Sequence, residues 1–192
     1  ESYVSKEADN WAKQKFREQK ITNKDFVVVF SVVSWTHPTW LKERFAELAD
    51  KLIENYGAEI IFLGTDKEKD FIYSIRELMK QRKNDYWFGQ TTIQELFALI
   101  KNSDLVVGID SGPTNIAAAL KKPVVTLFGA GDKAIWHPYS ENSISIQKDE
   151  VCTACMKSEC KWKESRNLEC MKAISVDDVL TAVNKLKIKK VI

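Results

Sequence analysis

The most constraining feature of this sequence is the alternation of short apolar runs with stretches of helical spacing. Short continuous runs of β-forming residues are typical of strands buried on both faces of a parallel sheet. Such runs lie at residues 26–30, 60–63, 86–88, 105–109 and 124–128. Helical spacing is found in segments 7–20, 41–56, 68–82, 92–102, 116–120 and 176–186. The alternation predicts an α/β domain with an open, mainly parallel sheet and helices on both faces.

The length and the net charge of the chain limit which classes of protein it can belong to. The 192 residues fit one domain with a substantial core, and the start at Glu1 rather than Met suggests a fragment or a processed form. The net charge is only +2, whereas nucleic-acid-binding domains are strongly basic, so no nucleic acid partner is expected. No apolar run approaches the roughly 18 residues that cross a bilayer. The sequence therefore predicts a cytoplasmic domain.

The strongest candidate for a ligand site is the turn 110–115, which follows a predicted strand and opens an alanine-rich helix. Open parallel sheets bind ligands beyond the carboxyl ends of their strands. Gly112 lets the backbone approach a ligand, and the free N–H groups of a helix start favour phosphate. An ordinary capped turn has the same composition, and general physics leaves both readings open.

Other loops at predicted strand ends carry weaker signals. Segment 129–132 contains two glycines, and segment 64–68 offers carboxylates that could accept hydrogen bonds from ribose hydroxyls. The same carboxylates would also suit the start of a helix. Trp136 and Tyr139 could line a sugar pocket, with core or loop packing as the alternative.

The four cysteines are clustered at Cys152, Cys155, Cys160 and Cys170. Cys-x2-Cys pairs recur in tetrahedral Zn²⁺ and Fe sites, and disulfides are disfavoured in a reducing cytosol. Three readings stay open, which are a structural Zn or Fe site, disulfides, and free thiols. No His or Asp pattern accompanies these cysteines, so the sequence does not indicate thiol catalysis.

Residues 103–138 read SDLVVGIDSGPTNIAAALKKPVVTLFGAGDKAIWHP. This stretch resembles glycosyltransferase family 9, the ADP-heptose:lipopolysaccharide heptosyltransferases, which have an Asp-[Ser/Thr]-Gly-x-x-His turn, an alanine-rich helix, a Pro-Val-Val strand and a Phe-Gly loop. Weaker similarity extends over residues 26–187. The resemblance implies the Rossmann-like C-terminal half of a GT-B fold. Residues 1–25 would form an N-terminal helix and interdomain linker, and residues 26–192 the nucleotide-sugar-binding domain, including a Cys-rich loop at 152–170.

The resemblance also implies an activity. Such a chain would help to move a sugar, heptose, from a nucleotide-diphosphate sugar such as ADP-heptose to a lipopolysaccharide-core-type glycolipid acceptor, without a catalytic metal. The family keeps its catalytic base and acceptor site in an N-terminal domain that nothing here matches. No catalytic residue is therefore expected in this chain, and the isolated half should turn over poorly. Peripheral association with the inner membrane of a bacterium would follow. The alternative is a non-catalytic nucleotide- or metal-binding module derived from the family.

The donor-binding residues that the resemblance implies are Ser34, Glu68, Thr91, Asp110, Ser111, Gly112, Thr114 and Asn115. Backbone amides of Ser111, Gly112 and Thr114 would face the phosphates, with the Ser34 hydroxyl nearby. Asp110 would orient the turn or contact the sugar.

Two further residues would hold the nucleoside, because Glu68 would bond the ribose and Thr91 would border the base. The chain departs from the family at two cationic positions. The histidine of the family turn is Asn115 here, and a family lysine falls at Pro38. An amide side chain can donate a hydrogen bond but carries no charge.

Overall fold

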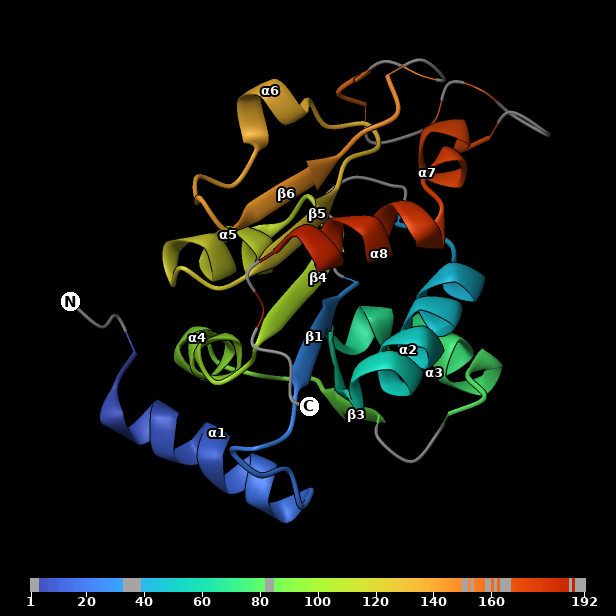
Figure 1. The fold of residues 1–192 in the computed structure, drawn as a ribbon. Coiled ribbons are helices and arrows are strands. Elements are labelled where there is room, and N and C mark those ends of the chain that lie inside the picture. The colour runs from blue at the N-terminus through green and yellow to red at the C-terminus, as the bar shows by residue number, and fades with distance from the viewer. Residues whose placement is uncertain are drawn as a thin grey trace.

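In the computed structural model of the protein, a six-stranded parallel sheet forms the centre of the molecule. Helices cover both faces of this sheet (Figure 1). The structure describes residues 4–32, 39–81, 85–149, 152, 154–157, 160, 162, 167–186 and 188. The strands are β1 (Val27–Ser31), β2 (Glu59–Leu63), β3 (Asp85–Phe88), β4 (Leu105–Ile109), β5 (Val124–Leu127) and β6 (Ser143–Ile146). The helices are α1 (Lys6–Glu18), α2 (Lys42–Tyr56), the 3₁₀ turn η1 (Asp66–Glu68), α3 (Lys69–Leu78), α4 (Ile93–Lys101), α5 (Gly112–Ala119), α6 (Lys133–Trp136), α7 (Glu169–Ala173) and α8 (Val176–Lys185). The predicted α/β fold is confirmed.

The strand order fixes where a ligand can bind. The order is β3-β2-β1-β4-β5-β6, and all five neighbouring pairs are parallel. The chain direction across the sheet reverses between β1 and β4, where Ser31 lies beside Gly108. In an open sheet of this kind, the crevice for a ligand lies beyond the carboxyl ends of the two strands that flank the reversal. The loops after β1 and β4 meet at that crevice.

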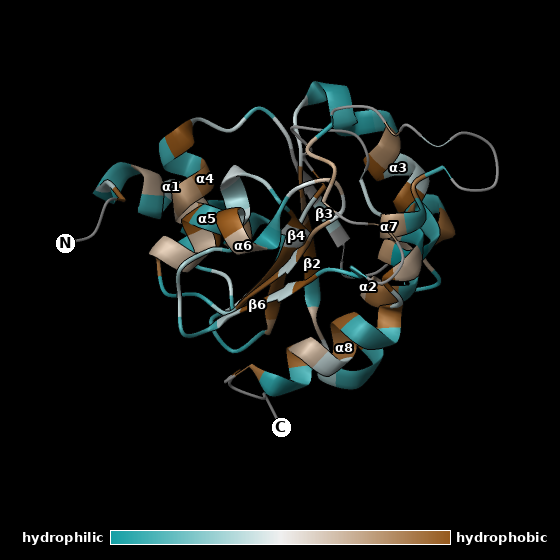
Figure 2. Cartoon of the chain, turned by 90° about the horizontal axis from the view of Figure 1, so that it is seen from above, coloured by the Kyte–Doolittle hydropathy of each residue, from teal (hydrophilic) through white to brown (hydrophobic). Residues whose placement is uncertain are grey.

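The two faces of the sheet carry separate apolar cores. Helices α2, α3 and α8 lie over one face, and α4 and α5 over the other, with α1 packed against α4 (Figure 1). Figure 2 shows the apolar strands enclosed between helices that mix hydrophilic and hydrophobic residues, as expected for helices with one buried side. Within the described residues, no helix combines the length and the apolarity that crossing a bilayer requires.

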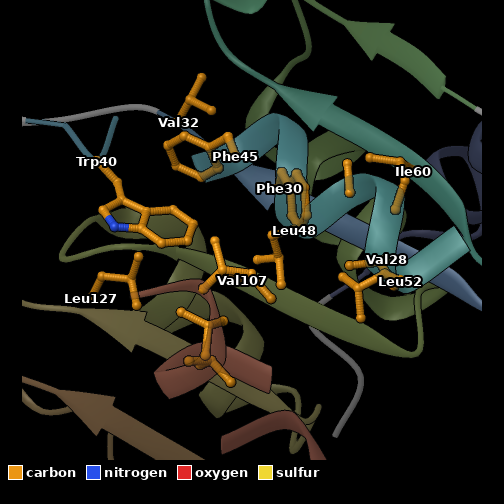
Figure 3. Close-up of a cluster of buried hydrophobic side chains, with 14 of the residues drawn as sticks. Val28, Phe30, Val32, Trp40, Phe45, Leu48, Leu52, Ile60, Val107 and Leu127 are labelled. Carbon is orange, nitrogen blue, oxygen red and sulfur yellow. The ribbon is translucent and has the colours of Figure 1, made fainter. Parts of the chain in front are cut away.

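Trp40 anchors the larger core (Figure 3). Its ring is fully buried and meets Phe45 edge-on, with 5.1 Å between the ring centroids. The Trp40 Nε1–H donates a hydrogen bond to the Ile174 carbonyl at 3.0 Å. The chain entering α2 is thereby tied to the junction of α7 and α8, which places the C-terminal helices beside the carboxyl end of the sheet.

Several elements differ from the sequence prediction. Helix α5 begins at Gly112 rather than near residue 116, because the Gly-Pro pair of the turn is itself its first turn. Strand β6 was not predicted. Its Ser-Ile-Ser-Ile sequence is half-exposed at the sheet edge and gives no continuous apolar run. The short helices α6 and α7 were missed as well, because four or five residues are too few to show a period.

Asp50 is a buried carboxylate that holds α2 to the end of α3. It is only 7% exposed, and its oxygens accept hydrogen bonds from the N–H groups of Lys80 at 3.0 Å and Gln81 at 2.8 Å. Two backbone donors that follow α3 would lose this acceptor if the side chain were removed. The carboxylate therefore stabilises the chain after α3.

Replacing Asp50 by Ala should lower the free energy of unfolding by about 1–3 kcal/mol, because it strands backbone donors away from water. Asp50→Asn keeps one acceptor oxygen and should lose less. Urea unfolding followed by circular dichroism measures both variants, with Asn55→Ala on the exposed side of α2 as the matched control. An Asp50→Ala protein as stable as the control would contradict this role.

Candidate functional site: a pocket at the start of helix α5

A cavity of about 390 Å³ opens at the carboxyl ends of β4 and β5. Its lining residues are Asp110, Ser111, Gly112, Asn115, Ala130, Gly131, Trp136 and Met156. The first four come from the turn between β4 and α5, the next three from the loop after β5 and from α6, and the last from the cysteine-bearing segment. The pocket therefore lies at the edge of the sheet where the strand order predicts a ligand.

The first turn of α5 leaves its backbone donors unused. Ser111 is the N-cap residue, but its hydroxyl points inward, donating to the Ile109 carbonyl at 3.0 Å and lying 3.4 Å from the Ser31 hydroxyl. Within the described part of the chain, no group accepts a hydrogen bond from the N–H of Gly112 or Thr114. A β-carbon added at Gly112 would have no atom within 4 Å. Gly112 thus presents a bare amide, at the positive end of the helix dipole, to open space, whereas Thr114 is buried behind it.

Thr114 and Asn115 hold the turn in shape. The Thr114 side chain is fully buried, and its hydroxyl donates to the Ser111 carbonyl at 2.8 Å, so it does not line the pocket. The Asn115 Nδ2 also donates to the Ser111 carbonyl, at 3.1 Å. Among the described residues, the lining contains no cationic side chain. Within this lining, the groups that can donate to an anion are therefore uncharged, and the backbone N–H of Gly112 is one of them.

Asp110 joins the two loops that form the pocket. A β-carbon at Gly131 would lie 2.5 Å from the Asp110 Oδ2, so only glycine allows this approach. The Asp110 N–H donates to the Leu127 carbonyl at 3.2 Å. Partial burial raises the pKa of the Asp110 carboxyl above its ordinary value. The pocket therefore contains a hydrogen-bond acceptor beside the bare amide.

The loop after β5 is held from both sides. The Gln147 Nε2 donates to the carbonyls of Gly131 at 2.6 Å and Gly129 at 3.4 Å, and its Oε1 accepts from the Lys133 N–H at 3.3 Å. From the other side, the Met156 N–H donates to the Ala130 carbonyl at 2.8 Å. Neither Gln147 nor Met156 was predicted, because single residues in unassigned loops give no pattern that a sequence search can use.

Trp136 and Tyr139 take different places. Trp136 is 51% exposed and lines the pocket, as one of the two readings of the sequence expected. Tyr139 is 94% exposed and borders a second hollow with His137 and Ser145. The side chain of Trp136 is therefore at the mouth of the pocket, and that of Tyr139 is outside it.

The predicted nucleoside-binding residues lie outside this lining. The Glu68 Oε2 accepts hydrogen bonds from the Thr65 N–H at 2.8 Å and the Thr65 hydroxyl at 2.6 Å, which is a capping box at the start of η1. Thr91 follows β3 and is half-buried. Both residues lie at the edge of the sheet that carries the pocket, on its β2 and β3 side, and their contact with a nucleoside stays a prediction. Ser34 lies outside the described residues.

The four cysteines are unpaired thiols, so the structure contains none of the disulfides that the sequence left open. Burial raises the pKa of the Cys170 thiol, and the nearby thiols of Cys152, Cys160 and Cys155 raise it further. A β-carbon added at Gly129 would lie 3.4 Å from the Cys170 Sγ, so this cluster lies directly behind the pocket loop. Among the described residues, no three His, Cys, Asp or Glu side chains are arranged to hold a metal ion.

Comparison with known proteins places this arrangement in a family. The model of glycosyltransferase family 9 (heptosyltransferase) matches residues 2–165. Lipopolysaccharide heptosyltransferase 3 of Escherichia coli K12 is 29% identical over 182 residues, which are 93% of this chain and 51% of that protein. The chain thus spans about half the length of the curated relatives that it matches.

Solved structures share the fold. The family 9 glycosyl transferase from Veillonella parvula superposes with a TM-score of 0.79 at 22% identity, over 94% of this chain and 51% of that one. The E. coli ADP-heptose lipopolysaccharide heptosyltransferase II gives a TM-score of 0.75 at 20% identity, with the same coverage of both chains. These structures agree with the Rossmann-like half of a GT-B fold. The resemblance seen in residues 103–138 is confirmed, and the chain belongs to glycosyltransferase family 9, the heptosyltransferase family.

Proposed function

We propose that this chain is the donor-binding half of a heptosyltransferase. It would bind a nucleotide-diphosphate sugar, ADP-heptose, whose heptose is transferred to a lipopolysaccharide-core-type acceptor. The observation that carries the proposal is the uncapped start of α5, where the N–H of Gly112 has no acceptor in the described structure and Gly112 itself lines the pocket. Such a site suits a diphosphate.

The chemistry explains why an uncapped helix start is useful. As an acceptor hydroxyl attacks the anomeric carbon, the bond from that carbon to the diphosphate oxygen breaks and negative charge grows on the leaving group. Oriented backbone N–H groups stabilise that charge without reorganising and without a catalytic metal. The bare backbone N–H of Gly112, at the start of α5, would take part in this task here.

The strand order suggests how the donor lies across the sheet. Neighbouring strands are about 4.8 Å apart, so β2 and β4 are separated by about 10 Å, which is within the length of an extended nucleotide-diphosphate sugar. With the diphosphate at α5, the ribose falls near Glu68 after β2 and the base near Thr91 after β3. The Ser34 hydroxyl would meet the phosphates from the loop after β1.

The remaining functional parts of such an enzyme would lie in the half of its relatives to which this chain has no counterpart. Its relatives are about twice as long, and the catalytic base and the glycolipid acceptor site would lie in their remaining half. Residues 1–25 would lead toward that half, with α1 packed on α4. A lipopolysaccharide precursor as acceptor implies a bacterial protein working in the cytoplasm, peripherally at the inner membrane.

Charge at position 112 tests the diphosphate site. Gly112→Asp and Gly112→Asn have side chains of the same size, and both fit the open space around Gly112. The carboxylate would repel the diphosphate, so Asp should weaken ADP binding at least about tenfold more than Asn does. Isothermal titration calorimetry with ADP measures both variants against the unchanged chain.

Three outcomes of that titration separate the readings. Equal affinity for ADP in the two variants would place the diphosphate elsewhere. No ADP binding by the unchanged chain at millimolar concentration would favour a metal-binding module without nucleotide. Tighter binding of UDP than of ADP would replace the adenine donor by a uridine one.

Asp110 should make ADP binding depend on pH. Its pKa is raised, so the carboxyl takes up a proton at a higher pH than a free carboxyl does. Once protonated it no longer repels the diphosphate, and ADP affinity should rise severalfold as the pH falls through that pKa. Asp110→Asn should bind ADP more tightly at neutral pH, and it should keep only the pH dependence of ADP's own phosphate. Parallel pH profiles for the two proteins would contradict the effect.

We also propose that the four cysteines hold a structural Zn²⁺ or Fe ion. Support comes from their spacing, from their unpaired state and from the mutual influence of their thiols on Cys170. The described side chains do not themselves form a ligand set of three, so metal content decides the matter. Protein purified under reducing conditions should contain about one equivalent of Zn or Fe, which Cys155→Ser should lower. Less than about half an equivalent in the unchanged chain would count against the site.

A further inference from the structure

We infer that Met156, in the described stretch 154–157 of the cysteine-bearing segment, belongs to the donor site, and that Met156 and Trp136 form two walls that hold the donor sugar above Asp110. The inference rests on the proposed function, because it assigns one part of the same ligand. It gives the segment around Cys155 a role in substrate specificity. It also explains two apolar side chains that lie at the surface of the molecule.

Met156 is held at the pocket by its backbone. Its N–H donates to the Ala130 carbonyl at 2.8 Å, and its φ of 52° lies in the left-handed region that side chains other than glycine rarely adopt. Backbone in such a region persists where its surroundings fix it, often at ligand sites. The side chain is nevertheless 55% exposed and lines the cavity. A flexible thioether that the core does not use is available to a ligand.

Trp136 gives the second wall. It is the last residue of α6, and its ring is 51% exposed while it lines the same cavity. Large apolar side chains around a concave site with few polar groups are typical of small-molecule pockets. The C–H face of a sugar ring packs on an indole ring, while its hydroxyls need acceptors such as the Asp110 carboxylate. The pocket offers both kinds of surface.

The strand order decides which part of the donor meets these walls. A ligand that extends from β3 and β2 to a diphosphate at the end of β4 continues over β5, the next strand in the sheet. The residues beyond the end of β5 are Ala130 and Gly131, with Trp136 and Met156 beside them. The group attached to the far phosphate is the sugar. Trp136 and Met156 therefore contact the sugar, and the nucleoside lies on the opposite side of α5.

The test compares ADP with ADP-heptose in calorimetric titrations of the 192-residue chain. The unchanged protein should bind ADP-heptose more tightly than ADP, because only the former reaches the two walls. Trp136→Ala and Met156→Ala should each reduce this preference about three- to tenfold, and leave the dissociation constant for ADP within about twofold. Ile135→Ala is the matched control, since it removes a neighbouring exposed side chain of α6 that does not line the pocket.

Three other results would overturn the inference, and each can be told from the others. Equal loss of affinity for both ligands would place the nucleoside between the walls. If both variants kept the full preference for ADP-heptose over ADP, Trp136 and Met156 would not contact the sugar. Absence of binding of either ligand by the unchanged chain would end the proposed function first, and the sugar site with it. Thermal unfolding of all variants separates loss of contact from loss of fold.

Discussion

The inward turn of the Ser111 hydroxyl is the interaction on which the site depends. At most helix starts, a serine in this position accepts a hydrogen bond from the backbone and satisfies one of the free N–H groups. Here the hydroxyl donates to the Ile109 carbonyl and lies beside Ser31, across the point where the strand order reverses. The sheet thus uses the side chain that would otherwise block the anion site. The pairing of β1 with β4 places the Ser31 hydroxyl beside this inward-turned side chain.

A second constraint brings the two pocket loops into close contact at one point, between Asp110 and Gly131. The Asp110 carboxylate occupies the volume that a side chain at position 131 would need. Gln147 donates to the carbonyls of Gly129 and Gly131 in the same loop, and Met156 donates to the Ala130 carbonyl between them. The pocket wall is therefore fixed by residues that are far apart in the sequence, and a shift in any of them moves the carboxylate relative to the helix start.

The sequence was sufficient for five of the six strands and for the centre of the site. Runs such as Val27–Phe30 and Leu105–Ile109 are buried on both faces, so their composition alone identifies them as parallel strands. The Asp-Ser-Gly turn was found because its residue types and its place before an alanine-rich helix are both informative. Strand β6 was missed because an edge strand with Ser at alternate positions has no apolar run. Gln147 acts through its side-chain amide and Met156 through one backbone hydrogen bond, and neither contact leaves a periodic pattern in the sequence. Glu68 shows a further limit of sequence-based prediction. The residue is a glutamate whether its carboxylate caps a helix or binds a ribose, so the sequence cannot separate the two roles.

The glycine at position 112 affects the free energy of unfolding. It is the first residue of α5, its φ is not in the left-handed region, and nothing lies near the place of its missing β-carbon. Alanine would fit there and would restrict the unfolded chain, and such a change ordinarily adds about 0.4–1 kcal/mol of stability. The fold alone would thus be better served by a larger residue. Glycine at this position therefore costs the fold stability and leaves the space beside the first amide of α5 empty.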